Sequence, residues 1–233
     1  YELGRAAASY ELPGKLREIS GIAAIDAHTL ACLQDERGAL YLFDLATGKR
    51  GRAIEFGPRG DFEGLATDGT TFWVLRSDGV VMRVESGFDE RRLRVVARGA
   101  LTAQQHEFEG LAWDPITQSL LVAPKTPLGG KPNEGLRRLY RVDPETLEQH
   151  PEPFVTIELA RVHEAAEQLG VSRKEREKRL RLRFAEVAVH PTTGELWLLS
   201  GVDRLLLVVG RDGAVRGMHF SSKKQQPQPE ARG

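Results

Sequence analysis

Short apolar runs alternate with polar turns along the whole chain of 233 residues. In one representative stretch, residues 70–75 form an apolar run, Ser77-Asp78-Gly79 forms a polar turn, and residues 80–85 form the next apolar run. Asp-Gly and Thr-Gly pairs are typical of hairpin turns, and short β-rich runs between them are typical of strands. The pattern therefore predicts consecutive antiparallel strands and an all-β fold.

One short phrase recurs along the sequence. Its copies are Ile19-Ser20-Gly21-Ile22-Ala23, Phe62-Glu63-Gly64-Leu65-Ala66, Phe108-Glu109-Gly110-Leu111-Ala112 and Phe184-Ala185-Glu186-Val187-Ala188. The second residues of successive copies lie 43, 46 and 76 residues apart, and Glu230 follows Ala185 by a further 45. Four strands per unit of about 40 to 45 residues are typical of a β-propeller blade.

We therefore expect one propeller domain over residues 1–233, with blades starting near Ser20, Glu63, Glu109, Ala185 and Glu230. This arrangement is a five-bladed-type β-propeller whose fifth blade is truncated, because the chain ends at Gly233. A propeller removes its sheet edges by closing its ring. We therefore expect residues 1–12 to supply a strand to the last blade.

The 76-residue interval requires an insertion, which we expect to be helical over residues 157–183. Leu159, Val162 and Ala166 recur near helical spacing, and Gly170 is a natural stop for that helix. Ser172 followed by Glu175 is a capping box that predicts a second helix. The segment 172–183 is rich in lysine and arginine, which indicates either a solvated face with i,i+4 pairs or a basic edge that contacts an anionic partner or lipid surface.

Composition narrows the possible functions. The chain is 40% hydrophobic, enough for a core, and its 33 basic residues balance its 33 acidic residues, which argues against nucleic-acid binding through bulk charge. Its one cysteine excludes a disulfide framework. The longest aliphatic run, residues 205–209, is far shorter than the roughly 20 residues that span a bilayer. The chain starts at Tyr1 without a visible signal peptide, which suggests a mature or trimmed form.

Several carboxylates are expected to converge at the central channel, because the first strand of each blade lines the propeller axis. The candidates are Glu18, Asp61, Glu63, Glu109 and Glu230. Carboxylates that converge in a narrow channel repel, so they protonate, pair with a basic side chain or bind a cation. Oxygen ligands without a histidine or cysteine cluster indicate Ca²⁺ before Zn²⁺. The alternative is that these side chains only lock neighbouring blades together.

A second group of polar residues follows the second strand of each unit. Alignment of the apolar runs brings together Asp35, Glu36, Arg76, Ser77, Lys125 and Ser200. These turns should open on the same face as the channel mouth and form a pocket suited to a small anionic ligand. The alternative is a set of salt bridges between blades, each of which contributes little when exposed. Trp73 and Trp197 fall at matching places in their units, which inter-blade packing explains.

Several of these phrases together resemble one known family. They are Leu16-Arg17-Glu18-Ile19-Ser20-Gly21, Gln34-Asp35-Glu36-Arg37-Gly38, Gly60-Asp61-Phe62-Glu63-Gly64-Leu65-Ala66, Leu75-Arg76-Ser77-Asp78-Gly79, Ala123-Pro124-Lys125 and Ala188-Val189-His190-Pro191. In this order, outside the helical insertion, they resemble the SdiA-regulated (YjiK-like) bacterial β-propellers, which are related in style to the esterase-like phytase propellers. The resemblance implies a periplasmic or extracellular location, with a possible membrane anchor before processing.

Two classes of function stay open. The first is a non-enzymatic propeller that binds Ca²⁺ and a small anionic ligand or a protein partner at the channel mouth. The second, implied by the resemblance, is a metal-assisted hydrolase of phosphoric or carboxylic esters. In that case Glu63 and Glu109 would hold the cation and activate water, while Lys125 and Arg76 would stabilise the developing negative charge. The chain has no G-x-S-x-G nucleophile elbow.

Overall fold

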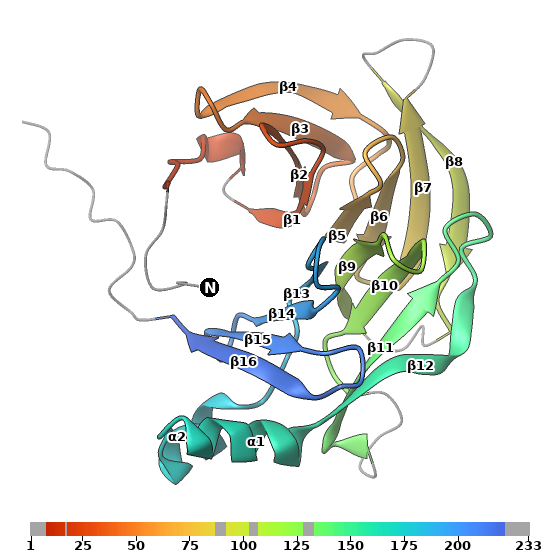
Figure 1. Cartoon of the computed structure of the whole chain (residues 1–233). Coiled ribbons are helices and arrows are strands. Elements are labelled where there is room, and N and C mark those ends of the chain that lie inside the picture. The colour runs from red at the N-terminus through yellow and green to blue at the C-terminus, as the bar shows by residue number, and fades with distance from the viewer. Residues whose placement is uncertain (1–7, 17, 87–91, 103–106, 128–132, 222–233) are drawn as a thin grey trace, which may run out of the picture.

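A computed structural model describes residues 8–16, 18–86, 92–102, 107–127 and 133–221 (Figure 1). These residues form four antiparallel sheets of four strands, and in each sheet the strands lie side by side in chain order. Each sheet is called a blade, numbered in chain order. A short 3₁₀ helix, Gly14–Leu16, precedes the first blade.

The strand bounds follow the expected repeat. Blade 1 contains β1 (Ile19–Ala24), β2 (Thr29–Gln34), β3 (Ala39–Asp44) and β4 (Lys49–Glu55). Blade 2 contains β5 (Phe62–Thr67), β6 (Phe72–Arg76), β7 (Val80–Ser86) and β8 (Leu93–Ala100). Blade 3 contains β9 (Phe108–Asp114), β10 (Ser119–Pro124), β11 (Leu136–Val142) and β12 (Gln149–Glu158). Blade 4 contains β13 (Glu186–Val189), β14 (Leu196–Ser200), β15 (Leu205–Val209) and β16 (Val215–Phe220).

The first strand of each blade is innermost, and the blades are arranged around a common axis as in a β-propeller (Figure 1). β1 lies against β5, β5 against β9, and β9 against β13. Three apolar cores join blades 1 and 2, blades 2 and 3, and blades 3 and 4. Within the described part of the chain, no comparable contact joins β13 to β1, so the ring is open between blade 4 and blade 1.

Glycines in the inner strands permit the close approach of neighbouring blades. A Cβ on Gly64 would lie 2.8 Å from the Cβ of Leu111 and 3.1 Å from its backbone nitrogen. A Cβ on Gly21 would lie 2.9 Å from the backbone nitrogen of Leu65, and one on Gly110 would lie 3.0 Å from that of Val187. These distances leave no room for a side chain, so the recurring glycine is a packing requirement at each closed junction.

The expected number of blades was wrong: the described residues form four blades, not five. The fifth unit was inferred only from Gln228-Pro229-Glu230, which lies outside the described residues. The expected strand from residues 1–12 is also not found in the part described, residues 8–12. Tyr10 instead packs edge-on against Phe43 and donates a hydrogen bond to the Leu45 carbonyl, so this segment covers blade 1 rather than the last blade.

Two helices, α1 (Leu159–Gln168) and α2 (Arg173–Arg179), lie between β12 and β13, outside the ring (Figure 1). Val162 and Ala166 on α1 are buried in the core shared by blades 3 and 4. Arg137 of β11 is buried, and its guanidinium donates to the carbonyls of Arg181 and Leu182. These contacts attach the end of the insertion to blade 3.

A search of the helices in the described residues finds none that is long and apolar enough to cross a membrane.

We predict that Gly64→Ala destabilises the protein by about 1–3 kcal/mol, because the new methyl group would overlap Leu111 and force the inner strands apart. Urea unfolding measures the change. Gly201→Ala is the matched control, since a Cβ there has no neighbour within 4 Å. Equal stability of the two variants would contradict the role assigned to the inner-strand glycines.

Candidate functional site

The channel mouth is built from the same backbone connections in three blades. The residue after the second strand donates its N–H to the carbonyl of the residue that precedes the first strand. These bonds join Asp35 to Glu18 at 3.2 Å, Ser77 to Asp61 at 3.0 Å and Lys125 to Glu107 at 2.9 Å. The repeat therefore gives Asp35, Ser77 and Lys125 equivalent places, whereas the aligned apolar runs had matched Asp35 with Arg76.

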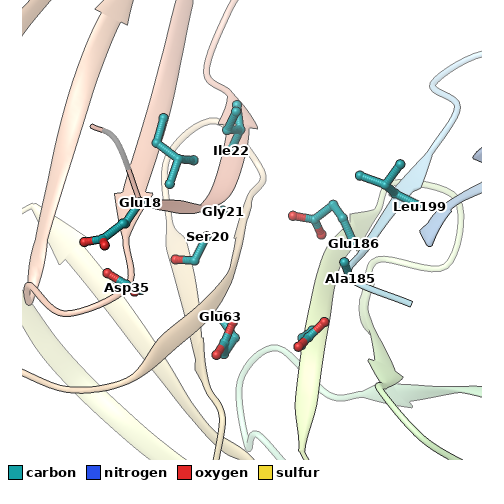
Figure 2. A pocket seen from close by; sticks show the side chains of 11 residues that line it. Glu18, Ser20, Gly21, Ile22, Asp35, Glu63, Ala185, Glu186 and Leu199 are labelled. Carbon is teal, nitrogen blue, oxygen red and sulfur yellow. The ribbon is translucent and has the colours of Figure 1, made fainter. Parts of the chain in front are cut away.

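A cavity of about 490 Å³ lies among the inner strands at this mouth. Five carboxylates are among its lining residues: Glu18, Asp35, Glu63, Glu109 and Glu186. Among the residues that the structure describes, no lysine, arginine or histidine lines it. Figure 2 shows Glu18, Asp35, Glu63 and Glu186 around this space, contributed by three different blades. The cavity therefore has a strong excess of acidic groups.

Lys125 neutralises part of this acidity. Its ammonium nitrogen lies 2.5 Å from Oε1 of Glu109 and 2.9 Å from Oε2 of Glu107. Hydrogen bonds to these two carboxylates raise the pKa of Lys125, which therefore stays charged. Glu109 is thus held by an internal cation.

Within the described residues, Glu63 forms no ion pair with a basic side chain. Burial, followed by the negative charges of Glu109 and Asp61, raises the pKa of Glu63 to about 7. The charge of Lys125 opposes this shift. Near neutral pH the Glu63 carboxyl is therefore divided between its protonated and ionised forms, which is the state suited to proton exchange with a bound molecule.

Glu186 is a second perturbed carboxyl, and it was not predicted from the sequence. Burial raises its pKa to about 8, although Oε1 accepts a hydrogen bond of 2.9 Å from the backbone N–H of Val187. Strand pairing places Glu186 of β13 opposite Leu199 of β14. Gly21, Gly64 and Gly110 occupy the equivalent position in the first strands of the other three blades. In the aligned repeat, Glu186 therefore stands where the other three copies have glycine, and this departure could have identified it from the sequence.

The open junction gives the cavity an apolar side. Ile22 is 49% exposed, whereas its counterparts Leu65, Leu111 and Val187 are at most 3% exposed. Leu199 is 43% exposed, whereas its counterparts Leu33, Leu75 and Ala123 are fully buried. Ile22 and Leu199 both line the cavity, and Figure 2 shows them on opposite sides of it. A ligand here would meet carboxylates and aliphatic carbon together.

The other sequence-derived ligand residues lie outside the lining of this cavity. Arg76 forms an ion pair of 2.9 Å with Asp78, and Glu36 forms one of 3.0 Å with Arg59. Ser77 donates a hydrogen bond of 2.5 Å to Asp61. Ser200 is buried and donates a hydrogen bond of 2.6 Å to Asp203.

The expected calcium ligands are only partly brought together. Glu18, Glu63 and Glu109 share the cavity, Asp61 accepts the Ser77 hydrogen bond, and Glu230 lies outside the described residues. Within the described ranges, no group of three or more histidine, cysteine, aspartate or glutamate side chains is arranged to hold a metal ion.

We predict that the perturbed Glu63 makes stability depend on pH. Its folded pKa of about 7 exceeds the ordinary glutamate pKa of 4.5. The free-energy cost of ionising the buried group is therefore absent below about pH 4.5 and complete above pH 7. Relative to Glu63→Gln, the native protein should therefore lose stability as pH rises from 4.5 to 7. Urea unfolding of both proteins at several pH values measures this difference. Parallel profiles would show that Glu63 titrates normally.

Comparison with known proteins identifies the fold and not a family. No protein-family model matches the chain, and a search of curated proteins finds no significant match. Among solved structures it is similar to glutaminyl cyclase from Myxococcus xanthus, with 16% identity over 79% of this chain and a TM-score of 0.51. It is similar to a structure in the nidogen/laminin complex, with 11% identity over 83% of this chain and a TM-score of 0.50.

A streptogramin B lyase is a further structural match, with 8% identity over 89% of this chain and a TM-score of 0.48. The chain spans 68%, 60% and 56% of the length of these three matched chains, in the order given. At such identities the likeness shows the β-propeller fold alone. It does not identify the SdiA-regulated propellers that the sequence phrases resemble.

Proposed function

We propose that the protein binds a small organic cation with an apolar body in the cavity at its channel mouth. The supporting observation is the described lining of the cavity, which contains five carboxylates and, within the described residues, no basic side chain. A protonated amine would compensate these charges and donate hydrogen bonds to the ionised Glu63 carboxylate. Ile22 and Leu199 supply an aliphatic surface beside the carboxylates, which suits the hydrocarbon part of the same molecule.

An anionic ligand, the expectation from the sequence, receives less support from the charges. That expectation required Lys125 and Arg76 to be unpaired cations at the channel mouth. Lys125 is engaged by Glu107 and Glu109, and Arg76 by Asp78. An anion would have to break these ion pairs and approach five carboxylates, which costs free energy that the cation avoids.

The residues do not fit a Ca²⁺ site as they stand. Calcium takes six to eight oxygen ligands at about 2.3–2.6 Å. The Lys125 ammonium already holds Glu107 and Glu109, and the raised pKa of Glu63 leaves its carboxyl only partly ionised near pH 7. In the titration described next, calcium therefore serves as an alternative ligand to the organic cation. The periplasmic or extracellular location stays a prediction from the resemblance.

Calorimetric titration with butylammonium, butyrate and calcium chloride tests the proposed ligand class. We predict that butylammonium binds, that butyrate does not, and that binding tightens between pH 6 and 8 as Glu63 ionises. Glu63→Gln should weaken binding about tenfold or more, since it removes one charged partner. Glu36→Gln is the matched control, because Glu36 is exposed and lies outside the cavity. Preferential binding of butyrate, or of Ca²⁺ alone, would refute the proposal.

Ester hydrolysis is a second candidate, favoured by one observation: the Glu63 pKa of about 7. An ionised Glu63 could remove a proton from water as the water oxygen attacks the ester carbonyl. The same group could then return the proton to the alkoxide that leaves. General acid–base catalysis of this kind contributes typically 10²–10⁴-fold in rate and requires a pKa near the working pH.

A panel of carboxylic and phosphoric p-nitrophenyl esters tests this candidate. We predict that any hydrolysis rises with pH through an apparent pKa near 7 and falls at least about a hundredfold in Glu63→Gln. Glu36→Gln should keep the native rate. Turnover that survives Glu63→Gln would exclude Glu63 as the base. The absence of turnover, with butylammonium still bound, would leave the cavity as a binding site.

A further inference from the structure

A group of exposed cations surrounds α2 on the outside of the ring. Its members are Lys174, Lys178, Arg181, Arg183 and Arg204, and together they are called the basic patch. None of the five forms an ion pair with another described side chain. Within the side chains that the structure describes, no ion pair offsets the positive charge of the patch.

The basic side chains of α2 lie on two different faces of the helix. Arg176 faces inward, where it donates a hydrogen bond of 2.7 Å to the Val171 carbonyl and pairs with Glu167 at 3.2 Å. At 3.6 residues per turn, Lys174 and Lys178 lie on the opposite side of the helix, one turn apart. The solvent-facing side of α2 therefore presents two neighbouring lysines.

The residues that follow α2 are held rigidly while their arginines stay in solvent. The buried Asp203 carboxylate accepts hydrogen bonds from the backbone N–H groups of Arg181, at 3.2 Å, and Leu182, at 2.7 Å. Leu182 is fully buried and has a positive φ of 47°, a strained conformation for a residue with a side chain. This backbone directs Leu182 inward between the exposed Arg181 and Arg183.

Two strongly exposed aliphatic side chains flank the basic patch. Leu169, between α1 and α2, is 62% exposed, and Val202, in the turn that contains Asp203, is 63% exposed. They are the two most exposed large apolar side chains among the described residues. Because Asp203 binds the backbone at 181–182, Val202 is attached directly to the basic segment. The cationic surface therefore has an exposed aliphatic side chain before α2 and another in the turn bound to the residues that follow α2.

We propose that the basic patch, with Leu169 and Val202, docks the protein peripherally on an anionic lipid surface. The cations would meet lipid phosphates and carboxylates, and the two aliphatic side chains would enter the boundary between headgroups and acyl chains. Single-stranded nucleic acid is the less suitable partner, because the patch contains no aromatic side chain for base stacking. The neighbouring acids Glu167 and Glu177 are already paired with Arg176 and Arg173, so they offset little of the patch.

Sedimentation with lipid vesicles tests this proposal on the intact protein. We expect binding to vesicles of phosphatidylcholine and phosphatidylglycerol at 3:1, and none to phosphatidylcholine alone. Binding should weaken as salt rises from 50 to 300 mM, as expected for screened surface charges. Each charge near such a surface changes affinity about fivefold, so Lys174→Glu/Lys178→Glu should lose at least about tenfold.

Matched variants separate this surface from general positive charge. Arg94→Glu/Arg98→Glu reverses two exposed arginines on β8, and it should bind vesicles like the native protein. Leu169→Ser/Val202→Ser should weaken vesicle binding several-fold without a change in melting temperature, because both side chains are exposed. Equal losses in the β8 and α2 variants would overturn the proposal. So would binding to duplex DNA or RNA in the absence of binding to the anionic vesicles.

Discussion

The close approach of neighbouring inner strands is the constraint on which the rest of the molecule depends. At the three closed junctions, a glycine in one strand faces the backbone of the next at a distance that excludes a Cβ. Only then can the aliphatic side chains of adjacent blades interlock into the three cores. The same approach brings Glu63 and Glu109 together, since each directly precedes a junction glycine. Packing thus concentrates the acidic groups that the site uses.

Glu186 explains why the remaining junction differs. It occupies the column that Gly21, Gly64 and Gly110 occupy elsewhere, so β13 carries a side chain where the others carry none. The neighbouring Leu199 stays exposed, and so does Ile22 across the opening. In the described part of the chain, the junction without a blade-to-blade core is therefore the one that offers a cavity with both polar and apolar walls.

The repeat made the blade architecture and the convergence of Glu18, Glu63 and Glu109 predictable, because a fixed interval in a propeller returns the chain to the axis. The number of blades was not predictable from Glu230, which is a single residue of a unit without the strands that define one. The pairing of Lys125 was also missed. The pairing depends on the conformation of the flexible lysine side chain, which the sequence repeat does not determine.

Lys125 determines what kind of chemistry the cavity can support. Its ammonium neutralises the Glu109 carboxylate through an ion pair within the chain, so Glu109 does not need a bound metal ion to balance its charge. Burial and the negative charges of Glu109 and Asp61 raise the pKa of Glu63, and the charge of Lys125 only partly opposes this shift. One carboxylate is thereby fixed and its neighbour remains free to exchange a proton. This division between two glutamates at equivalent repeat positions arises from the third blade alone, where lysine stands at the place of Asp35 and Ser77.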